Sequence, residues 1–205
     1  MNTVWHRPQP SMTADDFLAW PGDGTGRTFQ LVDGEVRPVS PASAAYGAIQ
    51  ANLAFLLKTA FRAAGLPLRV VTEAAIIPAL NAGTNVRVPD LAVTAARLER
   101  TQQELPEPLL IIEILSPGNQ DDTRDNVRAY ATLPSVQEMV VLYSTRLCAE
   151  VHRRDAKGAW LPNPETVAAN GRLRLPSVCL DVPLAEAYEG TWLAPKPPPS
   201  PTSRP

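Results

Sequence analysis

Hydrophobic and polar positions in the first third of the chain repeat with the period of a helix. A short helix is predicted over residues 13–20, because Thr13 is followed three positions later by an acid. A longer helix is predicted to begin at Ser43 and end at Gly65. Its core-facing stripe is expected to consist of Ile49, Leu53, Leu56, Ala60 and Ala64. Between the two helices, residues 28–36 have the pattern of a hairpin that turns at Asp33-Gly34.

After Gly65 the pattern changes from helical to extended, which predicts a series of short strands. They are expected near residues 68–72, 75–78, 86–94, 109–116, 138–143, 148–153 and 172–175. A short helix over 121–133 separates two of them. Residues 11–194 are therefore expected to form one mixed α+β domain. Residues 1–10 are expected to be a flexible arm, and residues 195–205, which hold six prolines, a disordered tail.

Two of the extended runs each carry one carboxylate near the middle of a strongly apolar stretch. Asp90 lies in Val86–Val93, and Glu113 follows 23 positions later in Leu109–Ser116. Burying an ionised carboxylate costs several kcal/mol unless a partner compensates it. Two such acids on neighbouring strands therefore suggest a shared divalent cation. Carboxylates with a backbone carbonyl and waters suit Mg²⁺ or Mn²⁺ better than zinc.

Spacing alone leaves a second interpretation open, in which Asp90 is a turn acid and Glu113 pairs with an arginine. Alternate residues of a strand share a face, so Asp90 and Ala92 point one way and Arg87 the other. Arg87 is therefore not expected to be the partner of Asp90. Pro89 has no backbone donor, which favours an edge, a bulge or a strand start where the acid emerges.

Composition changes this picture little. The 205 residues are 44% hydrophobic with a net charge of −2 and a pI near 5.7, so total charge does not indicate a nucleic-acid binder. Two histidines are too few for a histidine-rich metal site. Cys148 and Cys179 lack metal-site spacing and are expected to be reduced thiols. The sequence contains neither a signal peptide nor an 18-residue apolar span, so a cytoplasmic protein without a membrane segment is expected.

Several segments, taken in order, resemble the Uma-two putative restriction endonuclease family, a bacterial branch of the PD-(D/E)XK nuclease superfamily. The resemblance covers about residues 11–190. The segments are Phe29–Glu35, Val39–Ser43 with the long helix, Asn85–Asp90, Ile112–Pro117 and Asp122–Tyr130. Each is weak alone, but together in this order and spacing they are specific.

This resemblance implies a restriction-endonuclease-like fold, a central mixed β-sheet flanked by helices. It implies metal-dependent hydrolysis of DNA phosphodiesters, with DNA as the partner and Mg²⁺ or Mn²⁺ as the cofactor. Asp90 and Glu113 would be metal ligands, and the carbonyl of Ile114 a third. A homodimer is a further expectation, since dimers are common among nucleases that cut both strands.

The chain departs from the superfamily pattern at one position and from the family pattern at three. The superfamily lysine two positions after the second acid is Leu115 here, and the lysine that the family carries on the next helix is Asn126. The usual glutamate before Asp-Gly is Gln30, and the usual histidine near the start of the long helix is Tyr46. Arg124 and Arg128 lie on the far face of the helix and are poor substitutes, because arginine is a poor proton acceptor.

Three hypotheses follow for the activity. In the first, the chain is a Mg²⁺-dependent DNA endonuclease that uses Asp90 and Glu113, with Gln30, Asn126 or a water in the role of the lysine. In the second, catalysis is degraded, and an inactive nuclease fold binds nucleic acid or protein. In the third, a small α+β protein without a nucleic-acid role carries salt-bridged acids. Glu35 and Glu73 are expected to be exposed or ion-paired rather than part of the site.

Overall fold

The computed structural model describes residues 11–40 and 42–194 of the chain. The first half contains α1 (Ala14–Ala19), β1 (Phe29–Val32), β2 (Glu35–Pro38), α2 (Ala44–Ala64), β3 (Arg69–Thr72), η1 (Ala82–Thr84) and β4 (Leu91–Thr94). The second half contains β5 (Pro108–Leu115), α3 (Gln120–Tyr130), β6 (Glu138–Tyr143), β7 (Cys148–Arg153), β8 (Glu165–Ala168), β9 (Arg172–Leu175), η2 (Pro176–Val178), β10 (Leu180–Pro183) and η3 (Leu184–Tyr188). The predicted arm and proline-rich tail lie outside the described residues.

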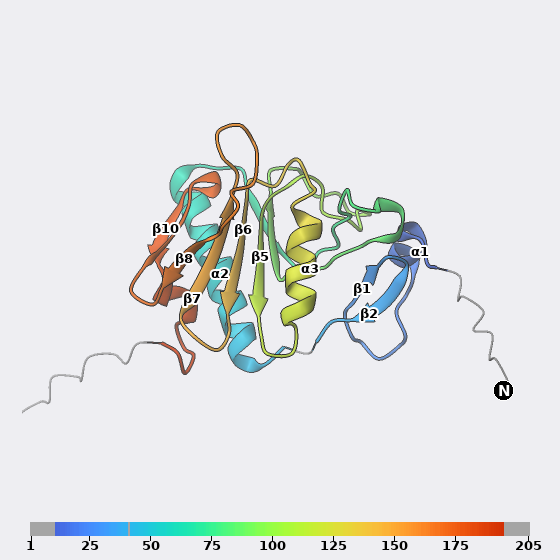
Figure 1. Ribbon diagram of the computed structural model, residues 1–205, viewed down its shortest axis with the longest axis horizontal. Helices are drawn as coiled ribbons and strands as arrows, with labels where there is room; N and C mark the ends of the chain where they lie inside the picture. Colours follow the sequence, from blue (N-terminus) through green and yellow to red (C-terminus); the bar gives the residue numbers. More distant parts are fainter. Residues whose placement is uncertain (1–10, 41, 195–205) are drawn as a thin grey trace, which may run out of the picture.

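A six-stranded mixed sheet, in the order β3-β4-β5-β6-β7-β8, forms the centre of the fold. Only β5 and β6 run parallel, because α3 lies between them in the chain and carries it back across the sheet. All other neighbours in this sheet are antiparallel. Figure 1 shows α2 on one face of the sheet and α3 on the other. The α+β fold class and the mixed sheet flanked by helices are thus confirmed.

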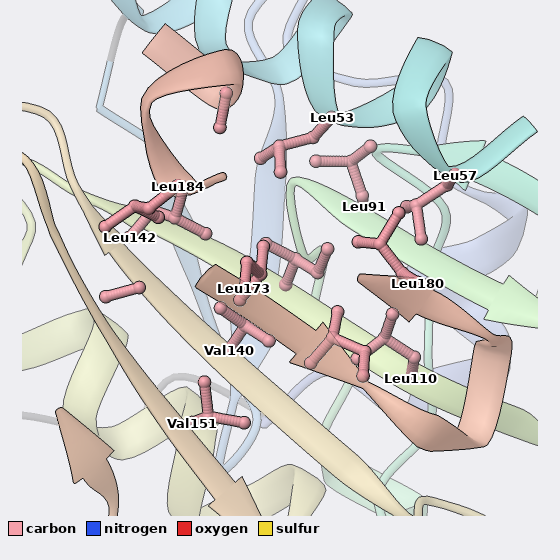
Figure 2. Packing of buried hydrophobic residues seen from close by; sticks show 14 of the residues in the cluster. Leu53, Leu57, Leu91, Leu110, Val140, Leu142, Val151, Leu173, Leu180 and Leu184 are labelled. Carbon is pink, nitrogen blue, oxygen red and sulfur yellow. The ribbon is translucent and has the colours of Figure 1, made fainter. Parts of the chain in front are cut away.

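Strand β5 separates two hydrophobic cores, since its alternate side chains point to opposite faces. Leu110, Ile112 and Ile114 pack in the core under α2, with residues from β9, β10 and η3. Figure 2 shows this packing, with Leu53 and Leu57 of α2 above the strands. Ile111 and Leu115 pack on the α3 side. Glu113 has the same parity as these last two residues, which directs it toward α3.

The long helix α2 has the predicted ends but a different buried stripe. Its N-cap Ser43 accepts from the backbone N–H of Tyr46, and Gly65 ends it with a φ of 63°, in the left-handed region that glycine adopts without strain. The buried residues are Ile49, Leu53, Leu57 and Phe61. Leu56 and Ala60 are only partly buried and Ala64 is exposed. Leu56 and Ala60 still pack against the core, so only Ala64 of the predicted stripe was wrong. Leu57 and Phe61 were missed, because the sheet contacts the helix along a strict four-residue spacing.

The segment before β4 is also less regular than predicted. Instead of a strand over 86–94, Val86 and Arg87 form isolated bridges to Leu31 and Ile76, and the strand itself begins at Leu91. Pro89 interrupts the ladder because it has no N–H to donate. The Leu31–Val86 bridge attaches the β1–β2 hairpin, which turns at Asp33-Gly34 as predicted, to the segment that precedes β4.

The remaining sequence predictions differ from the structure in small ways. Residues 75–78 contribute single bridges rather than a strand, and the third helix ends at Tyr130 instead of 133. Strands β8 and β10 were not predicted. Both cysteines are free thiols, as expected. Among the described residues, no helix combines the length and apolarity needed to cross a bilayer.

Candidate functional site

Asp90 and Glu113 lie side by side on neighbouring strands. Leu91 of β4 pairs with Ile112 of β5 in antiparallel register, so one position further Asp90 lies opposite Glu113. The backbone N–H of Ile114 donates to Asp90 Oδ2 at 2.5 Å. Both acids are buried, with 9% and 5% of their surface exposed. The convergence expected from the two apolar runs is present in the fold.

Helix α2 holds Asp90 from the other side. The hydroxyl of Tyr46 donates to Asp90 Oδ1, and Gln50 Nε2 donates to the backbone carbonyl of Asp90 at 2.9 Å. Tyr46 and Gln50 are one helical turn apart, so both reach the same residue. Together with the N–H of Ile114, these contacts fix both oxygens of Asp90 and its backbone.

Glu113 contacts an amide instead of a cation. Asn126 of α3 donates from Nδ2 to Glu113 Oε1 at 3.1 Å. The oxygen of the same amide accepts from Arg87 Nη1 at 3.2 Å. Arg87 makes no ion pair with Asp90 among the described residues; it is buried with 5% exposed and reaches the site through Asn126. A buried cation at this place was not predicted from the sequence.

A small cavity of about 30 Å³ brings the predicted residues together. Its walls include Gln30 from β1, Asp90, Glu113 and Asn126. Asp122, one turn before Asn126 on α3, also lines it. The predicted third ligand, Ile114, does not line it, and its carbonyl accepts from Asn119 Nδ2 at 3.1 Å.

A larger cavity of about 260 Å³ adjoins the small one and shares Asp90 and Tyr46 with it. Arg27, Thr28 and Glu73 line its other side. Arg27 is exposed and makes no ion pair within the described part of the chain. Asp90 thus lines both cavities, whereas Glu113 lines only the small one.

The electrostatics of the acid pair fit a cation. Burial raises the pKa of Asp90 to about 6, although the hydrogen bonds from Tyr46 and Ile114 lower that pKa. Burial, and next the charge of Asp90, raise the pKa of Glu113 well above its ordinary value. Burial and the same two acids raise the pKa of Tyr46, so its phenol stays protonated and donates. A buried acid pair with raised pKa values favours a proton or a divalent cation between its members.

The competing interpretation, with salt-bridged acids, does not agree with the structure. Neither Asp90 nor Glu113 makes an ion pair among residues 11–40 and 42–194. Arg124 instead pairs with Glu150, and Arg128 with Asp125. No cluster of three or more histidine, cysteine or acidic residues suited to a metal occurs in the described ranges either. Any cation here would have two carboxylates, with oxygen donors from backbone and water, a set that Mg²⁺ and Mn²⁺ accept.

The expectations for the other polar positions had mixed outcomes. Glu35 is exposed and ion-paired with Arg37, as expected. Glu73 is exposed but lines the larger cavity. Tyr46, at the position of the family's usual histidine, donates to Asp90. The one sequence signal for Arg87 was a charge inside a run that is otherwise apolar on both faces, which indicates burial.

The fold and the acid pair define a restriction-endonuclease-like α+β protein. A structural neighbour, described as "a putative nuclease belonging to DUF820" from Anabaena variabilis, has a TM-score of 0.70 at 19% identity, covering 86% of this chain and 97% of that one. The family model described as "Putative restriction endonuclease", Uma2, matches residues 14–184, and the chain belongs to this family. A curated relative, "Uncharacterized protein slr1290" of Synechocystis sp., is 24% identical over 185 residues, covering 89% of this chain and 94% of the relative.

Proposed function

We propose that the chain is a divalent-metal-dependent DNA endonuclease whose metal ligands are Asp90 and Glu113. The observation that supports this most directly is the small cavity, where two buried acids, which form no ion pair within residues 11–40 and 42–194, meet Gln30 and Asn126. Removing a carboxylate pair from water without compensation is costly, and a divalent cation is the compensation that such a pair accepts. Family membership supports the same reaction class. Residues 11–194 would act as one domain, and a homodimer remains a prediction.

Each residue of the site has a definite role in this proposal. Bound Mg²⁺ or Mn²⁺ would supply charge for the developing phosphorane and lower the pKa of a water. Tyr46 and the N–H of Ile114 hold the two oxygens of Asp90 toward the cavity. Asn126 holds Glu113 in the same way. The carbonyl of Ile114 can accept a second contact beside that of Asn119, because it has two lone pairs.

Asn126 orients Glu113 but does not handle protons. Its oxygen accepts from Arg87 and its NH₂ donates to Glu113, so both ends of the amide are occupied. An amide is also far too weak a base to take a proton from water. Asp122 is the further carboxylate on the wall of the small cavity, and we assign it the proton-accepting role. Gln30 would hold a water by hydrogen bonds.

DNA would reach the acids through the larger cavity. Arg27 is the cation on its wall, and Thr28 and Ser40 add hydroxyl groups. Guanidinium and hydroxyl groups are common donors to the phosphate oxygens of DNA. Replacing Arg27 by alanine should weaken DNA binding and reduce the slope of log K against log salt by about 1. Arg97, equally exposed but beside Glu99, is the matched control and should leave the slope unchanged when replaced. An unchanged slope for Arg27→Ala would remove this residue from the interface.

Nicking of supercoiled plasmid in Mg²⁺ or Mn²⁺ is the test of the function. The unmodified protein should convert plasmid to open circles, and Asp90→Ala and Glu113→Gln should each abolish the conversion. Asp181→Asn is the control, because Asp181 is an exposed acid that pairs with Arg172 on the β9–β10 hairpin. Nicking that persists in Asp90→Ala would refute the proposal.

A second candidate is an inactive nuclease fold that binds nucleic acid or protein. The occupied amide of Asn126 favours it, since nothing at the lysine position can act as a base. It predicts DNA or partner binding with little metal-dependent cleavage. Robust turnover by the unmodified chain would exclude it.

A further inference from the structure

A chain of hydrogen bonds joins two carboxylates through one buried guanidinium. Asn85 Nδ2 donates to Asp33 Oδ1 at 2.9 Å, and Arg87 Nη2 donates to Asn85 Oδ1 at 3.0 Å. On the other side, Arg87 Nη1 donates to Asn126 Oδ1 at 3.2 Å, and Asn126 Nδ2 donates to Glu113 Oε1 at 3.1 Å. In this series of hydrogen bonds Arg87 donates to the oxygens of both amides, and the NH₂ group of each amide donates to a carboxylate.

Arg87 is an unusual residue to find at this place. It is buried with 5% exposed, it has no carboxylate within ion-pair distance among the described residues, and its Nε has no hydrogen-bond partner there. Keeping a charge in such surroundings costs several kcal/mol, so stability alone does not account for it. In the described part of the chain its side-chain hydrogen-bond partners are two amides, those of Asn85 and Asn126.

The guanidinium determines which way the amide of Asn126 faces. Arginine has five N–H donors and no acceptor, so only the oxygen of Asn126 can face it. The NH₂ group must then face Glu113. An ionised Glu113 only accepts and so favours the same orientation. Without Arg87 the oxygen of Asn126 would lose its donor, and the amide, held only by Glu113, would be free to shift away from that carboxylate. Groups that hold a metal ligand in place in this way commonly change metal affinity by 10- to 100-fold.

We propose that Arg87 is a positioning residue, which orients Asn126 and through it holds Glu113 in the geometry that binds the divalent cation. This rests on the proposed function insofar as Glu113 is a metal ligand. Arg87 itself does not contact Glu113, since Asn126 stands between them. The hydrogen bonds from Arg87 to Asn85 and from Asn85 to Asp33 connect Arg87 to the β1–β2 turn and keep the guanidinium in place.

The test is a double-mutant cycle read by Mn²⁺ affinity in calorimetry. Arg87→Met removes the charge but keeps a side chain of similar length, and Asn85 Oδ1 keeps the N–H of Asp33 as a donor, so the variant should fold. Its dissociation constant for Mn²⁺ should rise by about 10-fold or more. In an Asn126→Leu background, Arg87→Met should have no further effect, because the intermediary is already absent. Arg87→Lys keeps a donor-only cation and should bind Mn²⁺ more tightly than Arg87→Met.

Arg154→Met is the matched control. Arg154 is a half-buried arginine that donates to backbone carbonyls and stacks on Trp160, so its loss should change stability but not Mn²⁺ affinity. Circular dichroism and thermal unfolding confirm that each variant is folded. Equal Mn²⁺ affinities of folded Arg87→Met and the unmodified chain would overturn the proposal, as would equal effects of Arg87→Met in the two backgrounds.

A metal-free measurement separates this proposal from the proposed function. The side-chain NH₂ of Asn126, identified by its absence in Asn126→Leu, should exchange slowly with solvent in the unmodified chain and faster in Arg87→Met. If exchange is slow in the unmodified chain and faster in Arg87→Met, but the unmodified chain does not nick plasmid, the nuclease function is refuted and the positioning role of Arg87 is retained. Exchange that is equally slow in both chains would refute the positioning role, whether or not DNA is cut. A chain without any Mn²⁺ affinity would refute both.

Discussion

The acid pair should make the metal-free protein less stable as pH rises. The pKa of Asp90 is about 6 in the folded chain, against an ordinary value of 3.8. The folded state thus binds more protons than the unfolded state between these values, and the free energy of unfolding falls as pH increases through that window. The cost of the ionised Asp90 is absent below pH 3.8 and fully present above pH 6.

Asp90→Asn should remove this cost. At about 1.4 kcal/mol per pKa unit, the variant gains about 3 kcal/mol of unfolding free energy at pH 8 and about 1 kcal/mol at pH 4.5. The hydrogen bonds survive the change, because the amide oxygen accepts from the N–H of Ile114 and the amide NH₂ donates to the hydroxyl of Tyr46. The stability gain therefore reflects the charge.

Urea unfolding in EDTA, followed by tryptophan fluorescence at the two pH values, measures this difference. Asp181→Asn is a control of opposite sign, since Arg172 lowers the pKa of Asp181 and replacing it should not stabilise the chain at pH 8. In MnCl₂ the unmodified chain should gain thermal stability and Asp90→Asn should not. A variant less stable than the unmodified chain at pH 8, or a difference independent of pH, would refute the reasoning.

Three further substitutions test the site and the core. Asp122→Asn should lower kcat for nicking at least 10-fold with little change in KM, whereas Asp121→Asn, in the same first turn of α3 but outside the small cavity, should not. Asn126→Lys alone should reduce thermal stability and not raise activity, because its ammonium would lie beside the buried Arg87. The double variant Asn126→Lys with Arg87→Met should recover thermal stability and activity. Leu57→Ala should cost about 2–5 kcal/mol in urea unfolding, as a fully buried leucine of α2.

The predictable part of this protein is the part encoded locally. The caps of α2, the turn at Asp33-Gly34 and the strands around Glu113 follow from the residues within each segment, since propensity and periodicity are properties of neighbours in the chain. The acid pair was also predictable, because an acid inside a strongly apolar run must be compensated wherever the fold buries it.

What the sequence determined by itself is therefore the helices and most of the strands, the family pattern and the two acids. Only the tertiary structure decided which groups stand beside those acids. Strand alternation predicts that Arg87 faces away from Asp90, yet packing against α3 brings it to Asn126, 39 positions later. Tyr46 reaches Asp90 across 44 positions in the same way. Such contacts depend on how helices pack on the sheet, which the period of a single segment does not contain.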